Sequence, residues 1–247
     1  MCIRDRGYIG QGGALAVLTA VVAFSLLMAA TRRETPPDGR ESAAPRQRAS
    51  LAGFVRRRGA WALAVAAFLS AMTAVAGYGL SKLYLVDAGW ALDAVGRIGM
   101  AGGMVTVLLG CGGGAWLIGK LGAHKVLALG LAASGAAALA WMAQAQGWMP
   151  VRPGMAFAAQ GLGSFGAGAA SVALMTLAMR FARQGQQSGT DMTAVQSARD
   201  LGEILISSML TGLAAQVGYG GGFASGVAVA AVTLLFTATA LRRAAPA

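Results

Sequence analysis

The sequence predicts an all-α, polytopic integral membrane protein built as a bundle of packed helices. The chain has 247 residues and is 56% apolar but only 12% charged, whereas soluble domains carry about 25% charged residues. Apolar runs of the roughly 20 residues needed to cross a bilayer recur along the chain. Most of its 37 glycines fall inside these runs, which is typical of membrane helices that pack closely through small residues.

Seven apolar runs are candidate transmembrane helices. Most of the connections between them are short, but residues 31–59 form a longer segment that contains prolines and eight arginines. This composition predicts a polar, basic linker with little fixed structure. The expected spans are 11–30, 60–84, 95–118, 125–146, 153–178, 190–214 and 223–241.

The orientation follows from the distribution of Lys and Arg, because cytoplasmic loops are enriched in both. If 31–59 is cytoplasmic, the loops near Lys120–Lys125 and Arg180–Arg183 and the tail 242–247 lie on the same side. The sequence therefore predicts a cytoplasmic C-terminus in a bacterial inner membrane.

The N-terminus is unusual for a complete protein of this kind. The first residues and the apolar run after them have features of a signal peptide, but Arg32 and Arg33 follow the run directly and no clear cleavage site precedes them. Seven spans with a cytoplasmic C-terminus would place the N-terminus on the outer side. We expect residues 1–10 to be an outer-side stub that can be artefactual, and 11–30 to be an internal helix of a longer protein.

The net charge of +11 would favour nucleic-acid binding in a soluble chain. Here the basic residues lie between apolar segments and are not interleaved with aromatic residues, so topology explains them and no nucleic-acid partner is expected. Two cysteines and one histidine provide no disulfide framework and no set of metal ligands. No second histidine could act as the base of a hydrolase. We therefore expect neither an enzyme nor a metal or cofactor.

The most informative segment is a polar helix face near the C-terminus. At about 100° per residue, its six polar positions fall within an arc of about 120°. A charged face on a membrane helix is costly, and it usually lines a cavity or a substrate path. The face consists of Thr193, Gln196, Arg199, Asp200, Glu203 and Ser207.

Spacing suggests how the charges on this face are paired. Arg199 and Glu203 are four residues apart and can pair, and so are Gln196 and Asp200. Asp200 then needs another partner or a proton, which is the property that a proton-coupled carrier requires. The alternative is an Arg–Glu–Asp cluster that only joins helices.

Three further residues are candidates for solute contact. Tyr78, Ser81 and Lys82 share one face near the outer end of the second span. Lys82 can extend to the headgroups or meet an anionic substrate or a carboxylate. Gln160, in the outer third of the fifth span, is either a substrate contact or an interhelical hydrogen bond.

The run Gly161-Leu-Gly-Ser-Phe-Gly166 matches the G-x-G-x-x-G pattern of dinucleotide-binding folds. That function requires a preceding strand in a βαβ unit, and this run lies inside an apolar helix. We therefore interpret it as a site of close helix packing. Gly99, Gly103, Gly110 and Gly114 are expected to serve the same purpose.

Residues 60–241 resemble the C-terminal six-helix half of a major facilitator superfamily transporter. Gly114-Ala-Trp-Leu-Ile-Gly-Lys120-Leu-Gly-Ala-His-Lys125 is similar to the short loop motif between the second and third helices of each half, although Gly119 stands where that motif usually has an acidic residue. The resemblance implies that 11–30 is the last helix of a missing first half and that 31–59 is the central cytoplasmic loop.

A narrower resemblance lies in Ser188-Gly-Thr-Asp-Met-Thr-Ala-Val-Gln-Ser-Ala-Arg-Asp-Leu-Gly202. It is similar to the eleventh helix of the family that contains AmpG-type muropeptide permeases, acetyl-CoA transporters and RhtX/FptX siderophore importers. The run 196–203 and the later Gly218-Tyr-Gly-Gly-Gly-Phe223 look most like the siderophore branch.

These observations predict secondary active transport of a polar small-molecule solute, with protons as the coupling ion and a siderophore as the first candidate. The missing N-terminal half and the lipid bilayer would be the other partners. Muropeptide import and proton-driven drug efflux are the alternatives within transport. A non-transporting membrane scaffold is the alternative of another class.

Overall fold

The computed structural model describes residues 11–31, 50–185 and 187–241. The chain divides into two compact units, Met1–Arg46 and Gln47–Ala247. In the first unit, α1 (Gln11–Thr31) is an apolar helix that coincides with the first predicted span. The hydroxyls of Thr19 and Ser25 donate to carbonyls of their own helix, at 2.9 Å each, so neither leaves a polar group unpaired in the apolar helix.

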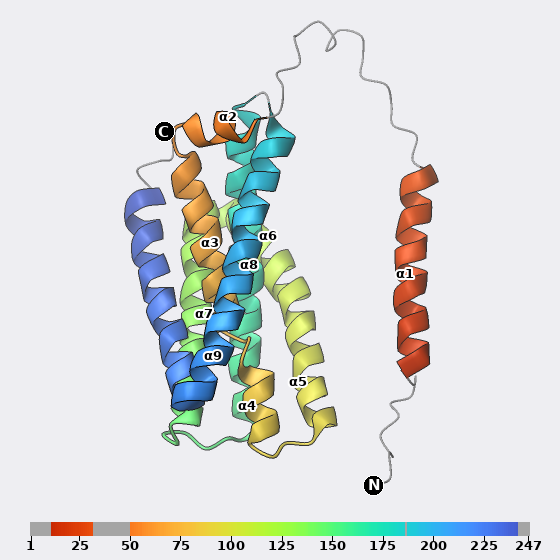
Figure 1. Ribbon diagram of the computed structural model, residues 1–247, viewed down its shortest axis with the longest axis vertical. Coiled ribbons are helices and arrows are strands. Elements are labelled where there is room, and N and C mark those ends of the chain that lie inside the picture. The colour runs from red at the N-terminus through yellow and green to blue at the C-terminus, as the bar shows by residue number, and fades with distance from the viewer. Residues whose placement is uncertain (1–10, 32–49, 186, 242–247) are drawn as a thin grey trace, which may run out of the picture. The chain divides into compact units, whose positions relative to one another are not determined.

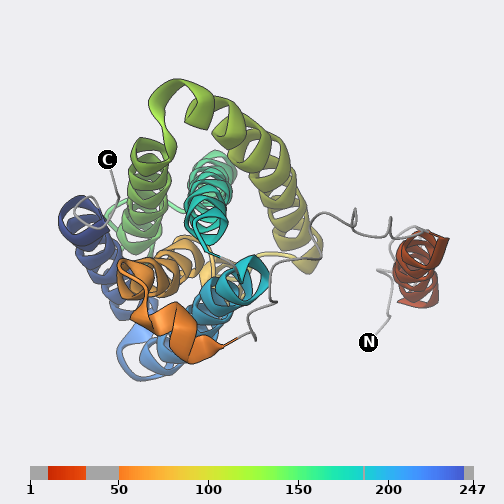
Figure 2. The ribbon, with the colours of Figure 1, turned by 90° about the horizontal axis from the view of Figure 1, so that it is seen from above.

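The second unit is a bundle of helices, most of which run up and down along one direction, while the stretch 92–121 is steeply inclined to them (Figures 1 and 2). The turn that follows this stretch and the connection after Arg183 lie at the same end of the bundle as α2 (Leu51–Arg56), which we call the α2 end; the loops 88–91 and 146–152 lie at the opposite end. The elements are α2 (Leu51–Arg56), α3 (Ala60–Ala76), α4 (Ser81–Asp87), α5 (Leu92–Val105), the π-helical η2 (Thr106–Gly113), α6 (Gly114–Leu121), α7 (Ala123–Ala145), α8 (Pro153–Arg183), α9 (Ser188–Phe236) and the π-helical η3 (Thr237–Leu241).

Five helical stretches in the described residues are long and apolar enough to cross a membrane: Ala60–Asp87, Leu92–Leu121, Ala123–Ala145, Pro153–Arg183 and Ser188–Thr239. They confirm a multi-pass helical membrane protein, and their bounds lie close to those predicted. The first predicted span, 11–30, is not among these five; it overlaps a shorter apolar stretch of α1, Leu15–Thr31.

The fifth stretch contains the last two predicted spans. Gly218, with φ 76° and ψ 172°, has a non-helical backbone that glycine adopts without steric cost. The chain changes direction there, and the segment after it turns back along the bundle (Figure 1). The predicted break between 214 and 223 is thus a turn at this glycine.

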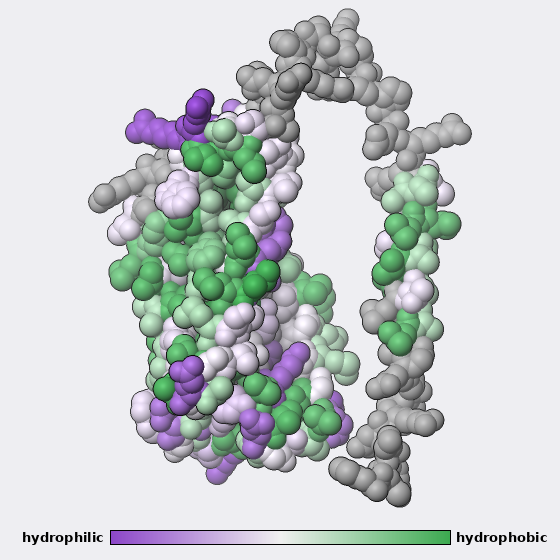
Figure 3. Space-filling model, viewed as in Figure 1, coloured by the Kyte–Doolittle hydropathy of each residue, from purple (hydrophilic) through white to green (hydrophobic). Residues whose placement is uncertain are grey.

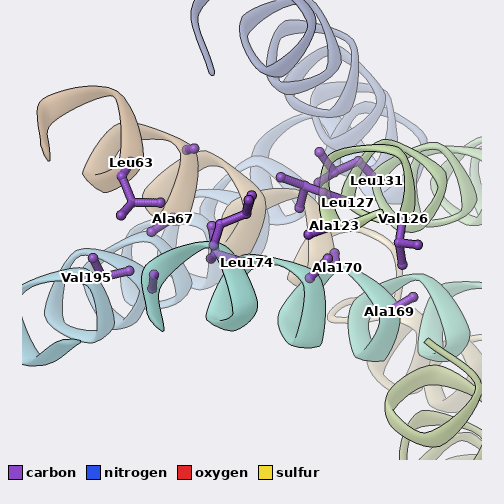
Figure 4. Close-up of a cluster of buried hydrophobic side chains, with 14 of the residues drawn as sticks. Leu63, Ala67, Ala123, Val126, Leu127, Leu131, Ala169, Ala170, Leu174 and Val195 are labelled. Atoms are coloured by element: carbon purple, nitrogen blue, oxygen red, sulfur yellow. The ribbon is translucent and has the colours of Figure 1, made fainter. Parts of the chain in front are cut away.

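Two clusters of buried side chains hold the bundle together. The cluster nearer the α2 end joins α3, α7, α8 and α9 through residues such as Leu63, Leu127, Leu174 and Val195 (Figure 4). The other cluster is aromatic. Trp141 stacks on Phe223 with ring centroids 6.2 Å apart, and Tyr84 meets Phe223 edge to face at 6.0 Å. Because these contacts join helices far apart in sequence, they fix how the polar positions of α9 lie in the bundle.

The G-x-G-x-x-G run lies inside α8, as its interpretation as a packing motif requires. A Cβ on Gly166 would lie 2.6 Å from the carbonyl oxygen of Gly130 on α7, and a Cβ on Gly163 would lie 2.6 Å from the carbonyl oxygen of Gly77. Gly161 has no neighbour within 4 Å of such a Cβ. Two of the three glycines therefore permit close helix contact, and the third does not.

We expect Gly166→Ala to lower the free energy of unfolding by about 1–3 kcal/mol, because the added methyl group meets backbone that cannot move alone. Gly161→Ala is the matched control in the same helix. It should be neutral or stabilising by up to about 1 kcal/mol, since alanine favours helix over glycine. Unfolding of both variants in mixed detergent micelles measures the difference. Equal effects would contradict the packing interpretation.

One expectation for the segment 31–59 is wrong. Residues 32–49 lie outside the described part of the chain, but Leu51–Arg56 forms the helix α2 instead of unstructured linker. The Ser50 side chain accepts a hydrogen bond from the Gly53 amide at 3.3 Å and caps the helix. Phe54 is buried against Phe181, with ring centroids 5.8 Å apart. A long-range contact therefore orders a segment whose overall composition is polar.

Candidate functional site

The predicted polar face lies on the first segment of α9, before the turn at Gly218. The opposite side of this segment is anchored in the bundle by the buried residues Val195, Gly202, Ile206 and Leu210. A Cβ on Gly202 would overlap the backbone of Phe68, so α9 approaches α3 closely there. Thr193, Asp200 and Ser207 are exposed, and Gln196, Arg199 and Glu203 are partly exposed. The six residues therefore form one accessible surface.

Both i,i+4 pairs expected on this face form. Arg199 pairs with Glu203, with Nη2 and Oε1 2.9 Å apart. Gln196 donates from Nε2 to Asp200 Oδ1 at 2.8 Å. Within the described residues Asp200 has no cationic partner, so its charge is balanced only by an amide dipole. One carboxylate of the face is thus neutralised by an arginine, and the other is not.

Arg199 also makes a contact that the sequence did not predict. Its Nη1 donates to Ser171 Oγ on α8 at 3.0 Å. Beside this contact is a small recess with room for about one water molecule, which is bordered by Arg199, Ser171 and Ser70 among other residues. The Ser70 hydroxyl is buried without a hydrogen-bond partner. Arg199 thus joins the polar face of α9 to α8 and to a small, mainly apolar recess beside α3.

Thr193 and Ser207 use their hydroxyls within their own helix. Thr193 donates to the Gly189 carbonyl at 3.0 Å, and Ser207 donates to the Glu203 carbonyl at 2.7 Å. Such bonds leave the oxygen lone pairs available as acceptors. Both residues can therefore present acceptor oxygens on the exposed face.

Tyr78, Ser81 and Lys82 do not share one helix face as expected, because the chain leaves the α-helical path between α3 and α4. Tyr78 lies in that break and is partly buried. Lys82 is exposed, and its side chain lies along α5 at Gly99. The break thus separates Tyr78 from Lys82, which lies against α5.

Gln160 forms the interhelical hydrogen bond that was one of its two expected roles. Ser81 on α4 donates to Gln160 Oε1 on α8 at 2.8 Å, and Gln160 Nε2 donates to Ser164 at 3.4 Å. All three side chains are buried. This network lies inside the bundle, away from the exposed polar face. Ser164 was missed because nothing in the sequence distinguishes it from other serines in apolar helices.

The site contains hydrogen-bond donors and acceptors, one neutralised ion pair and one carboxylate held by an amide. Such an arrangement offers hydrogen-bond donors, hydrogen-bond acceptors and charge to a polar solute. Among the described residues no group of three His, Cys, Asp or Glu side chains lies close enough to hold a metal ion.

The match to a known family agrees with this architecture. A family model described as Major Facilitator Superfamily matches residues 8–207, which include α1 and all six residues of the polar face. No curated protein and no solved structure matches the chain. The family match spans most of the sequence, and the chain folds as a multi-pass bundle of apolar helices. The protein therefore belongs to the Major Facilitator Superfamily, a family of membrane transporters that are typically not enzymes.

Proposed function

We propose that this protein is a proton-coupled secondary transporter and that the polar face of α9 lines its solute path. The proposal rests on one observation: the two carboxylates on this accessible helix face have different kinds of partner. Glu203 is paired with Arg199, whereas Asp200 has, among the residues that the structure describes, only the amide of Gln196 as its partner. A carboxylate without a counter-charge in a membrane span is costly to keep unless it has a function. Proton exchange at Asp200 is that function.

We further propose that residues 60–241 form the second six-helix bundle of the transporter and that α1 is the last helix of the first bundle. The support is the accessible polar face itself, because exposing it to lipid would be unfavourable. Transporters of this architecture bind solute between two bundles, which rock against each other for alternating access. The face would then border the central path opposite the first bundle.

Arg199 is the proposed solute-binding cation. It is only partly exposed and already pairs with Glu203 and Ser171. An anionic group of a solute can compete with Glu203 for the guanidinium, which would leave Glu203 free to accept a proton. Tyr78 and Lys82 are supporting contacts, with Thr193, Gln196 and Ser207 as further polar contacts along the face. Gln160 is assigned to positioning α4 because its side chain is buried.

The proposed solute is a siderophore or a related iron chelate, imported across a bacterial inner membrane. The support is the resemblance of the segments 188–203 and 218–223 to siderophore importers. Muropeptide import and proton-driven drug efflux use the same kind of polar face and are the competing transport functions. A scaffold that transports nothing is the competing function of another class.

Uptake into inner-membrane vesicles tests these functions, with the protein expressed together with the five helices that would complete the first bundle with α1. We expect radiolabelled ferric siderophore to accumulate when a proton gradient is imposed, and a protonophore to abolish the accumulation. Labelled muropeptide and a fluorescent drug substrate are tested in parallel. Gradient-driven movement of only one of these would identify that solute instead. No gradient-driven movement of any of the three would contradict the transporter proposal for these solute classes.

A further inference from the structure

Helix α2 is fixed across one end of the bundle by contacts on its inner side (Figure 1). Phe54 is 5% exposed and packs on Phe181. Arg57 pairs with Asp191, and the Gln187 side chain bonds both the amide and the carbonyl of Ser50, at 3.1 Å each. These contacts hold α2 at both its ends, so its outer side is presented in a fixed orientation.

The outer side of α2 combines apolar and cationic side chains. Leu51 and Val55 are 65% and 62% exposed, and Trp61, at the start of α3, is 73% exposed. Arg56 and Arg58 are exposed beside them and form no ion pair within the described residues. Large apolar side chains next to unpaired arginines suit the boundary between acyl chains and headgroups, where tryptophan is also enriched.

Four more cations surround this end of the bundle, and none of them forms an ion pair with a residue that the structure describes. Lys120 and Lys125 flank the turn at Gly122, and Arg180 and Arg183 occupy the last turn of α8; all four are exposed. Lys120 lies over the Trp116 ring, 4.0 Å from its centroid. Within the described part of the chain, the acidic side chain at this end is Asp191, which is buried and paired with Arg57. Counting only the residues that the structure describes, this end presents positive charge without exposed negative charge. Figure 3 shows hydrophilic side chains beside hydrophobic ones over α2.

Chain connectivity sets the depth of α2 in the membrane. The apolar stretch Ala60–Asp87 begins directly after Arg58 and Gly59. Its first turn must lie near the edge of the hydrocarbon layer, so α2 lies at the level of the headgroups. Soluble acidic partners would meet the arginines but would leave Leu51, Val55 and Trp61 without apolar contact.

We propose that α2 and the cations around it form a binding surface for anionic phospholipids. Arg56 and Arg58 bind headgroup phosphates, and Leu51, Val55 and Trp61 insert at the top of the acyl chains. Lys120, Lys125, Arg180 and Arg183 extend the attraction around the end of the bundle. The occupant is an anionic lipid surface because charge and apolar contact are required together.

Native mass spectrometry of the purified full chain tests this surface. The chain in nonionic detergent is titrated with phosphatidylglycerol or with phosphatidylcholine, and bound lipid is counted. We expect phosphatidylglycerol to be retained preferentially. R56Q/R58Q should weaken that preference about tenfold or more, because each cation near an anionic surface contributes a several-fold effect. R97Q/R152Q also removes two positive charges, but near the opposite end of the bundle, and it should change the preference for phosphatidylglycerol little.

Two further arms distinguish a lipid surface from a site that binds only small soluble anions. Leu51→Asn combined with Val55→Asn should weaken lipid retention while both arginines remain. Soluble glycerol 1-phosphate should fail to compete at concentrations where the lipid saturates. Circular dichroism and gel filtration check that every variant is folded. Equal retention of the two lipids, equal losses in the two arginine double variants, or full competition by glycerol phosphate would each overturn the proposal.

Discussion

Asp200→Asn is expected to abolish gradient-driven solute accumulation while leaving solute exchange across the membrane intact. Each coupled proton contributes about 2.3 kcal/mol per 100 mV of membrane potential, which can sustain an accumulation of about fifty-fold. An asparagine keeps the shape of Asp200 and a hydrogen bond with Gln196 but cannot carry a proton. The accumulation ratio should therefore fall toward one. Uptake under an imposed gradient and counterflow exchange without a gradient measure the two properties separately.

The matched control is Asp93→Asn at the other end of the bundle. Asp93 is exposed and pairs with Arg97, with Oδ2 and Nη1 2.7 Å apart, so its removal changes one exposed ion pair of small energetic value. We expect normal accumulation in that variant. If Asp200 only joins helices, Asp200→Asn should lower thermal stability and leave accumulation per folded molecule unchanged. That result would contradict a coupling role.

Features that depend on local spacing along one helix were predictable from the sequence. The pairs Arg199–Glu203 and Gln196–Asp200 form because both partners lie on one helix, where four-residue spacing brings side chains together. The span bounds were also predictable, since they depend on the length of apolar runs. The turn at Gly218 lies in a glycine-rich sequence, Gly218-Tyr-Gly-Gly-Gly222, that does not favour a continuous helix.

The features that sequence reasoning missed depend on which helix faces meet. Arg199 contacts Ser171 because of how α8 and α9 pack against each other. Small residues occur on many sides of α8, so its sequence does not indicate which of its faces meets α9. The structured α2 was missed for a related reason: Phe54 finds its partner, Phe181, far away along the chain. The break between α3 and α4, which separated Tyr78 from Lys82, was likewise not visible in an apolar run.

Loss of the contact between Arg57 and Asp191 is expected to lower the stability of the protein by a large amount. The Asp191 side chain is 1% exposed and that of Arg57 is 23% exposed. Asp191 also accepts a hydrogen bond from Gln187 at 3.4 Å. Arg57 in turn donates to the Phe181 carbonyl at 2.6 Å and lies over the Phe181 ring, 3.9 Å from its centroid. This single cluster joins α2 to the α8–α9 connection.

Arg57→Met is therefore expected to lower the free energy of unfolding by about 3–5 kcal/mol, because it leaves a buried carboxylate without its counter-charge. Asp191→Asn should cost less, since the longer Arg57 side chain can turn toward solvent and the amide retains a hydrogen bond with Gln187. The double variant should recover part of the loss, because no charge is then stranded. Unfolding in mixed detergent micelles across this double-mutant cycle measures the coupling.

Arg183→Met is the control for charge alone. Arg183 is exposed in the last turn of α8 and forms no ion pair within the described residues, so its replacement should change stability by less than about 0.5 kcal/mol. If Arg57→Met acts by leaving the Asp191 carboxylate without its counter-charge, the effects of the two substitutions are not additive. The double variant should then lose less free energy of unfolding than Arg57→Met alone. If the two single losses simply add, the burial of Asp191 is not what makes Arg57 necessary, and the anchoring of α2 depends on Phe54 instead.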